Sequence, residues 1–372
     1  MVLIIGLQSS FVDRADRRTR LVADTLRGQG YDVQPVNMVS ADRDGRGPRL
    51  LSPAYKVVSG LCKWRNVLSA IRRHDFIQVD FDLVNSSRVS ALLLLVASGF
   101  LGKRSVLAVS SVSGEAVLGL RGLIFRRMLR TANVVIAGSE ESARLLRRFN
   151  ANVKVIPLTA LAHGTAMRHD NGLQPRVGLV APIGPGILGS VVRGLGLVKQ
   201  KYPRAELVIM VNREQAGAIK SQLAESAQNG VDLVVCKNEL QMVQALYTCD
   251  VYFETSSQVD PSPALIEALA KGVPVVGIDT AGTINLISHG VTGLVVAAGN
   301  HVDLANRLCE LVETPELVRT LSSGAGALAK QHDRAAVSAA WAQLYFMFSA
   351  AGQKAPDWPG RFSPGYQTTV KA

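Results

Sequence analysis

The stretch from Pro261 to Gly277, PSPALIEALAKGVPVVG, limits the possible folds more than any other part of the chain. Ser262 suits the N-cap of a helix, Pro263 suits the first helical position, and Gly272 stands where a left-handed C-cap residue belongs. The apolar run after it is typical of a parallel strand that is covered on both faces. The stretch therefore predicts a short helix followed at once by a buried strand, with one carboxylate, Glu267, among apolar neighbours.

Length and periodicity together predict two α/β domains. A chain of 372 residues is too long for one ordinary core. Apolar strand-like runs alternate with helical segments in both halves, which indicates open, mostly parallel sheets with right-handed crossovers. We predict a first domain over 1–165, a second over 172–334, a helix over 335–350 that packs back on the first domain, and a loosely ordered tail over 353–372.

The sequence contains no sign of a membrane span, a disulfide framework or a metal site. The longest apolar run, over 89–101, is well short of the roughly 20 residues that cross a bilayer. The four cysteines are scattered without metal or disulfide spacing, as in a reduced cytosolic protein. Two Asp-x-Asp triplets, at 42–44 and 80–82, lie in the expected first domain, and such triplets arise easily by chance. These triplets therefore do not indicate a metal site.

The positive charge is confined to the first half of the chain. Residues 1–170 contain 25 Lys and Arg against 13 Asp and Glu, whereas residues 171–372 contain 16 of each. A field of one sign favours an anionic partner, which could be nucleic acid, an anionic membrane or an acidic substrate. Aromatic residues make up 5% of the chain and no nucleic-acid recognition motif occurs, so we expect no nucleic-acid partner.

Two expected helices of the first half combine basic and apolar residues. The helix over 119–130 carries Arg126, Arg127 and Arg130, and the helix over 56–73 carries Lys63 and Arg65. Such helices can lie on an anionic membrane, where each basic residue contributes about 1 kcal/mol. A helix packed on the sheet with a solvated basic edge explains the same pattern. These five residues are the expected membrane or acceptor contacts.

The order of these elements resembles the GT-B glycosyltransferases, particularly the retaining family 4, over nearly the whole chain. The main motif is ALIEALAKGVPVVGIDTAGTINLISHGVTGLVVAAGN, from Ala264 to Asn300. The segments RRMLRTANVVIAGSEESARLL, KVIPL, KYPRAELVIMV and ELQMVQALYTCDVYFETSS support it. The resemblance implies two doubly wound Rossmann-like domains facing across a cleft. It also implies a nucleotide-sugar donor on the second domain, an acceptor on the first, and neither a cofactor nor a metal.

The resemblance assigns Glu267 to the ribose hydroxyls of the donor, where a carboxylate accepts two hydrogen bonds at once. A solvated surface glutamate is the alternative for this residue. The other expected donor-binding residues are in or beside this motif, after the first strand of the second domain, or after the first strand of the chain: Ser262, Pro263, Ala264, Gly282, Thr283, Gly184, Gly186, Gln8 and Ser9. Backbone N–H groups near Gly184 and Gly186 could bind phosphate ahead of a helix, although a plain tight turn explains these glycines equally well.

Several family positions are altered in this sequence. Val259 stands where the family has a second Glu, and Asp260 is the expected substitute, with a turn residue before a proline as the alternative. Ser110 or Ser111 stands at the position of a family His, and we take Ser111, with Asp260, as the candidate catalytic residues. The Arg and Lys that neutralise the donor diphosphate are missing, since no basic residue precedes Arg193 in that region.

We therefore expect a hexosyltransferase, retaining if the family holds, that uses a nucleotide diphosphate-sugar. The expected acceptor is lipid-linked or a polysaccharide in cell-envelope or exopolysaccharide synthesis. The expected location is cytoplasmic, peripheral on the anionic inner face of the cell membrane. The missing Arg, Lys, His and Glu support the alternative, a catalytically impaired GT-B relative that binds a glycan or a partner protein.

Overall fold

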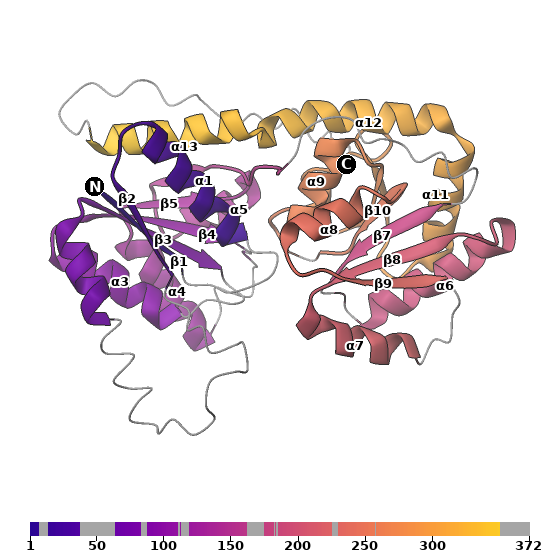
Figure 1. Ribbon diagram of the computed structural model, residues 1–372, viewed down its shortest axis with the longest axis horizontal. Coiled ribbons are helices and arrows are strands. Elements are labelled where there is room, and N and C mark those ends of the chain that lie inside the picture. The colour runs from indigo at the N-terminus through magenta and orange to yellow at the C-terminus, as the bar shows by residue number, and fades with distance from the viewer. Residues whose placement is uncertain are drawn as a thin grey trace. The chain divides into compact units, whose positions relative to one another are not determined.

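The chain forms two compact units in a computed structural model that describes residues 1–6, 14–37, 64–82, 88–110, 112, 119–161, 175–181, 183, 185–224, 230–256 and 258–349 (Figure 1). The first unit comprises Met1–Pro157 and Ala335–Ala372, and the second comprises Leu158–Arg334. The first division thus falls between Pro157 and Leu158, whereas the sequence predicted domains over 1–165 and 172–334. The tail expected over 353–372 lies outside the described residues.

The first unit is built on a parallel sheet of strand order β2-β1-β3-β4-β5-β6. Its strands are β1 (Val2–Gly6), β2 (Val33–Asn37), β3 (Phe76–Asp82), β4 (Arg104–Ser110), β5 (Val134–Ala137) and β6 (Val153–Val155). Parallel strands require long crossover connections. Helical segments between these strands include α1 (Arg14–Gly28), residues 64–73, α3 (Arg88–Phe100), α4 (Gly119–Thr131) and α5 (Glu140–Arg147).

Helices cover both faces of this sheet. Residues 64–73, α3, α4 and α5 share one core cluster with strand residues such as Leu3 and Leu107. On the other face, α1 and α13 (Arg334–Ser349) share a second cluster with strand residues such as Ile4 and Ala108. The helix α13 thus follows the second unit in sequence but packs on the first, where Trp341 is 1% exposed.

The second unit repeats this architecture with the strand order β12-β11-β10-β7-β8-β9. Its strands are β7 (Arg176–Val180), β8 (Glu206–Val211), β9 (Val231–Val235), β10 (Val251–Glu254), β11 (Val275–Ile278) and β12 (Leu294–Val296). Its helices include α6 (Pro185–Lys201), α7 (Arg213–Ala224), α8 (Glu239–Leu246), α9 (Pro263–Lys271), α10 (Ala281–Ile284), α11 (His301–Glu313) and α12 (Pro315–Ala329), which the 3₁₀ turn η3 (Lys330–His332) follows. Two parallel six-stranded sheets confirm the predicted two-domain α/β fold class.

The helix α9 has the ends that its sequence predicts. The Ser262 hydroxyl accepts a hydrogen bond from the Leu265 N–H at 3.0 Å, and Pro263 occupies the first turn. Gly272 ends the helix with φ = 71°, a left-handed conformation that glycine adopts without steric cost. Every residue from Pro263 to Ala270 is buried, so α9 is an internal helix.

The first residues of the second unit are held against the end of that unit. The Ala160 N–H donates to the carbonyl oxygen of His332 at 2.9 Å, and His332 Nδ1 lies 2.6 Å from the carbonyl oxygen of Leu158. The two points at which the chain passes between the units, after Pro157 and after Arg334, therefore lie next to segments that bind each other.

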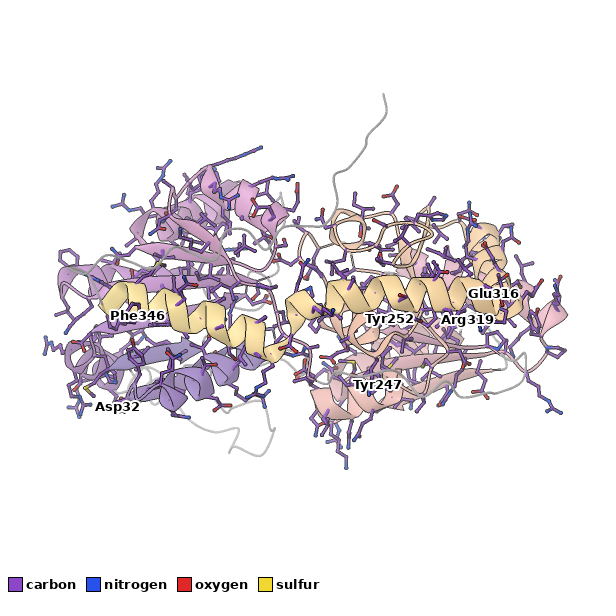
Figure 2. The ribbon with its side chains drawn as sticks, turned by 90° about the horizontal axis from the view of Figure 1, so that it is seen from above. Asp32, Tyr247, Tyr252, Glu316, Arg319 and Phe346 are labelled. Atoms are coloured by element: carbon purple, nitrogen blue, oxygen red, sulfur yellow. The ribbon has the colours of Figure 1, made fainter. Side chains whose placement is uncertain are left out.

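Replacement of Trp341 by Ala is expected to lower the unfolding free energy of the first unit by about 3–5 kcal/mol, because it removes a large, fully buried side chain. Phe346 on the same helix is 46% exposed and labelled in Figure 2, and it serves as the control. Its replacement by Ala should cost under about 1 kcal/mol. Scanning calorimetry of both variants measures the difference, and equal shifts would contradict the packing of α13.

Two glycines of α12 give a second test of packing. A Cβ at Gly324 would lie 2.2 Å from the carbonyl oxygen of Val291, whereas a Cβ at Gly326 would meet nothing within 4 Å. Gly324→Ala should therefore destabilise the second unit by about 1–3 kcal/mol, and Gly326→Ala should stabilise it by about 0.5–1 kcal/mol. Chemical denaturation of the two variants measures both values, and changes of the same sign would refute the close approach at Gly324.

Candidate functional site

Both sheets have a point where the strand order reverses, and ligands of open parallel sheets bind outside the carboxyl ends of the strands at such a point. In the second unit this point lies between β7 and β10, and in the first between β1 and β3. Gly186 follows β7, and Ser262 to Glu267 follow β10. Gly282 and Thr283 follow the neighbouring strand β11. The fold thus brings these predicted donor-site residues to one edge of one sheet.

A carboxylate that the sequence analysis did not single out, Glu254, ends β10 at this edge. It is 2% exposed, and its oxygens accept hydrogen bonds from the Ser256 N–H at 2.7 Å and the Tyr252 hydroxyl at 3.2 Å. It also accepts a hydrogen bond from the Ser262 hydroxyl. Because that hydroxyl also caps α9, Glu254 fixes the start of the helix to the end of the strand. Its place at the end of the apolar run VYFE is the sequence feature from which this residue could have been found.

Burial and the Glu254 charge both act on Tyr252. They raise the pKa of the Tyr252 hydroxyl well above its ordinary value, with burial as the larger cause. The hydroxyl therefore stays protonated over the physiological range and can keep donating to Glu254.

Glu267 is completely buried in the middle of α9. Its Oε1 accepts a hydrogen bond from the Leu161 N–H at 2.8 Å, and its Oε2 accepts one from the Tyr247 hydroxyl at 3.0 Å. Tyr247, labelled in Figure 2, is the C-cap residue of α8. The carboxylate thus connects α9 to α8 and to the first residues of the second unit. With no surface open to solvent, it can meet a ribose only after its surroundings move.

The loop after β10 packs tightly on the turn after β11. A Cβ at Gly282 would lie 2.1 Å from the carbonyl oxygen of Gln258 and 3.3 Å from that of Asp260, so only glycine fits there. The Thr280 hydroxyl lies 2.8 Å from the carbonyl oxygen of Ser256 and 3.1 Å from Thr283 Oγ1. Asp260, the candidate catalytic residue, is 3% exposed inside this contact.

The region after β7 contains little positive charge. Between Arg176 and Arg193 the sequence has no Lys or Arg. Arg176 lies at the start of β7, where its guanidinium is 3.3 Å from Glu206 and 3.6 Å from Asp232. Arg193 lies within α6, exposed, and donates to the Ser190 hydroxyl at 3.3 Å. Gly186 lies in the first turn of α6 and is exposed.

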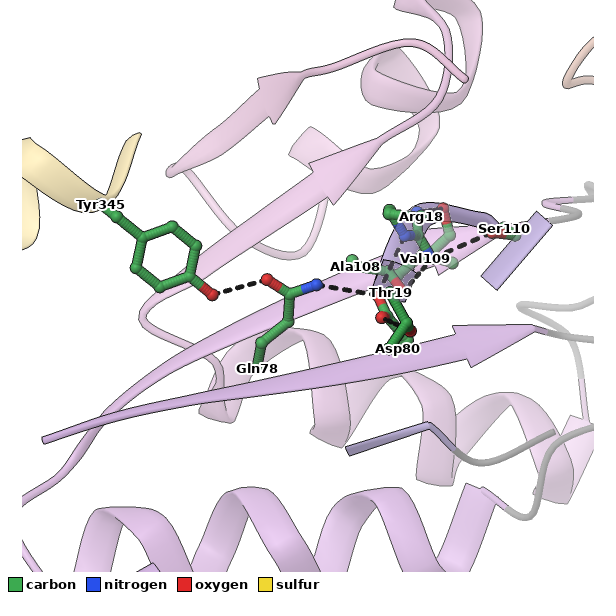
Figure 3. A network of polar contacts seen from close by, with 8 residues as sticks. All are labelled: Arg18, Thr19, Gln78, Asp80, Ala108, Val109, Ser110 and Tyr345. Atoms are coloured by element: carbon green, nitrogen blue, oxygen red, sulfur yellow. Dashed lines mark hydrogen bonds and ion pairs between the residues drawn. The ribbon is translucent and has the colours of Figure 1, made fainter. Parts of the chain in front are cut away.

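In the first unit a buried polar network lies at the carboxyl ends of β3 and β4 (Figure 3). Asp80 is fully buried and accepts hydrogen bonds from Arg18 Nε at 2.9 Å, Gln78 Nε2 at 3.1 Å and the Thr19 hydroxyl. Burial raises the pKa of the Asp80 carboxyl, and the Arg18 charge acts against that rise. The Tyr345 hydroxyl of α13 donates to Gln78 Oε1 at 2.5 Å, which extends the network from α1 to α13 on the same face of the sheet.

Arg18 also binds the end of β4. Its guanidinium donates to the carbonyl oxygen of Ala108 at 2.9 Å and to the Ser110 hydroxyl at 3.0 Å. Ser110 is therefore tied to Asp80 through Arg18. The network was not predicted, because α1 meets β3 and β4 only in the folded unit.

The other predicted site residues are distributed as follows. Gln8, Ser9, Ser111, Gly184 and Lys63 lie outside the described residues. Arg65, Arg127 and Arg130 are exposed, and Arg126 is partly exposed.

The part of the chain that the structure describes contains neither a membrane-spanning helix nor a cluster of metal ligands. Among the described helices, none is both long enough and apolar enough to cross a membrane. Within the same ranges, no three His, Cys, Asp or Glu side chains are placed to hold a metal ion.

A protein-family model matches part of the second unit. Residues 189–314 match the model of the family described as Glycosyl transferases group 1. No curated protein matches the sequence.

Solved structures match most of the chain. The structure of HepE from Anabaena with UDP-glucose has a TM-score of 0.67 at 16% identity, over 92% of this chain and 99% of that one. Sucrose-phosphate synthase from Thermosynechococcus elongatus has a TM-score of 0.66 at 17% identity, over 94% and 99%. The pneumococcal O-GlcNAc transferase GtfA, solved with UDP and GlcNAc, has a TM-score of 0.59 at 12% identity, over 77% and 60%.

These similarities confirm the resemblance found in the sequence. The chain has the GT-B glycosyltransferase fold, and its residues 189–314 match the glycosyl transferases group 1 family.

Proposed function

We propose that this protein transfers a hexose-type sugar from a nucleotide diphosphate-sugar to an acceptor, with retention of configuration. The observation that carries the proposal is the family match over 189–314, which spans the predicted donor residues Ser262, Glu267 and Thr283. The HepE structure with UDP-glucose and the GtfA structure with UDP and GlcNAc support the same class of donor. The donor is a substrate, and we propose that the reaction needs no resident cofactor or metal.

In this proposal the donor lies at the carboxyl ends of β7, β10 and β11. Negative charge develops on the leaving diphosphate during transfer and needs stabilisation at the donor site. The region between Arg176 and Arg193 supplies no cation, so we propose that backbone N–H groups in the first turn of α6, where Gly186 is exposed, contact the phosphates. One such donor contributes about 3–4 kcal/mol to a transition state of this kind.

Glu267 takes the ribose hydroxyls in the proposed complex, and Asp260 supplies the second carboxylate of the site. Each oxygen of an ionised carboxylate has two acceptor positions. The Leu161 N–H and the Tyr247 hydroxyl occupy one position on each oxygen of Glu267. Because Glu267 is completely buried, binding of two ribose hydroxyls requires these contacts to rearrange.

We propose that the acceptor is lipid-linked or a polysaccharide and that the protein works peripherally on the inner, anionic face of the cell membrane. The support is electrostatic, because the whole net charge of +12 lies in residues 1–170. Exposed Arg127 and Arg130 on α4 and exposed Arg65 belong to this basic half. Cell-envelope or exopolysaccharide synthesis suits an acceptor of this kind.

A second candidate is a GT-B relative that binds a glycan or a partner protein without catalysis. Two observations favour it. Glu267 is fully buried and already connects Leu161 to Tyr247, which is a sufficient structural role for a carboxylate. No basic residue follows β7 to neutralise a diphosphate before Arg193.

Nucleotide binding separates the two candidates. A ligand that binds only the folded protein raises the melting temperature. We expect one of the UDP-, GDP- or dTDP-sugars to raise it, and the same compound to release its nucleoside diphosphate when a polyprenyl-phosphate-linked glycan is added. Absence of any shift with all three nucleotide classes would reject the transferase and favour the binding protein.

The role of Glu267 is tested by Glu267→Gln, with Tyr247→Phe as the matched control. Glu267→Gln removes the charge that strengthens hydrogen bonds to the ribose, so donor affinity measured by calorimetry should fall about tenfold or more. Tyr247→Phe removes one structural hydrogen bond to the same carboxylate and should lower stability with little change in affinity. If both variants lower only stability, Glu267 is a structural residue and the ribose assignment is wrong.

A further inference from the structure

The helix α3 has an apolar face turned away from the core of the first unit. Its buried residues, Ala91, Leu94, Leu95 and Ser98, lie along one side. On the opposite side Val89 is 54% exposed, Leu93 is 50% exposed and Phe100 is 88% exposed, with partly exposed Val96 between them. Positions 89, 93, 96 and 100 fall within one narrow stripe of a helix with 3.6 residues per turn. We call these four residues the α3 stripe.

Such a stripe is unusual on a surface helix. Helices of globular proteins normally place polar residues opposite the core, and an exposed apolar patch marks a surface that meets a membrane or another protein. Phe100 is the most exposed of the large apolar side chains in the described residues. We therefore expect the α3 stripe to contact a membrane or another protein.

The neighbouring helices of the same layer surround the stripe with positive charge. Residues 64–73 and α4 share the core cluster of α3 on one face of the sheet, so the outer sides of all three helices point away from that face. The exposed residues on the outer side of α4 are Leu123, Arg127 and Arg130, and those of residues 64–73 include Arg65 and Arg72. The three helical segments together contain eight Arg and no Asp or Glu.

This charge decides between the candidate occupants. A second copy of the chain, docked face to face, would bring the exposed arginines of the two copies against one another, and like charges across an interface disfavour association. An anionic lipid surface can bind both the apolar stripe and the arginines beside it. The apolar side chains enter the boundary of the acyl chains, and the arginines contact the headgroups. By contrast, α5 on the same sheet face pairs Glu140 with Arg147 and Glu141 with Arg144, so these side chains add no net positive charge.

We propose that the α3 stripe and the arginines beside it form a surface that binds this protein to an anionic membrane, with α3 lying along the membrane surface. The proposal refines the membrane location given under the proposed function and rests on that location. It moves the apolar contact from the two basic helices expected from the sequence to α3, and leaves Arg127 and Arg130 as the headgroup contacts.

The test is flotation of the full chain with vesicles of phosphatidylcholine alone or with added phosphatidylglycerol. We expect binding to the anionic vesicles at low salt and partial release at high salt. Leu93→Ser with Phe100→Ser should lower the partition coefficient about tenfold at both salt concentrations, because it removes apolar burial. Arg127→Gln with Arg130→Gln should lower it about 25-fold at low salt and much less at high salt, because it removes two headgroup contacts.

The matched control is Leu240→Ser with Val302→Ser, two apolar residues of the second unit that are 58% and 50% exposed. This pair should change the partition coefficient less than twofold. Equal loss in the control pair, or vesicle binding that neither test pair alters, would overturn the proposal.

Light scattering and nucleotide binding complete the design. A wild-type dimer that the Leu93→Ser, Phe100→Ser pair converts to monomers, without vesicle binding, would replace the membrane by a second copy. The nucleotide-induced melting shift should be the same in all three pairs. If the protein does not bind vesicles but a nucleotide still raises its melting temperature, only the membrane-binding surface is rejected. If it binds vesicles but no nucleotide raises its melting temperature, only the donor site is rejected.

Discussion

Buried carboxylates organise both units, because an ionised group inside a protein is tolerated only where hydrogen bonds or an opposite charge replace its water. Asp80 meets this requirement with Arg18, Thr19 and Gln78. Glu254 meets it with hydroxyl and backbone donors, and its partner Ser262 is the cap of α9. In each case the compensation fixes the end of a central strand relative to a helix, at the edge where open sheets bind ligands.

The same requirement explains why the ends of α1 and α9 are well placed for chemistry. Arg18 cannot leave Asp80 without exposing an unpaired buried charge, so Ala108 and Ser110, which Arg18 binds, stay in position at the end of β4. Ser262 is similarly constrained by Glu254. These strand and helix ends are therefore fixed before a ligand arrives, and groups fixed in this way are the usual source of electrostatic stabilisation of a transition state. Glu267 differs from them, because its surroundings must move before it meets a ligand.

What the sequence could predict was local. The cap, the first proline and the left-handed glycine of α9 depend on residues close to one another in the chain, and all three are present in the structure. The partners of Glu267 could not be predicted, because Leu161 is 106 positions away and enters only through the fold. The apolar run over 89–101 shows the same limit: its length excluded a membrane span, but which side of α3 stays exposed depends on its neighbours.

Glu267 depends both on its local sequence and on contacts made only through the fold. Its position in a buried helix follows from its apolar neighbours, yet its hydrogen bond to Leu161 holds the segment that begins the second unit, and His332 holds the same segment from the other side through Leu158 and Ala160. The carboxylate thus anchors this segment to α9 and, through the Tyr247 hydroxyl, to α8. Its burial is therefore a consequence of where the chain crosses between the units, and does not by itself exclude a ligand.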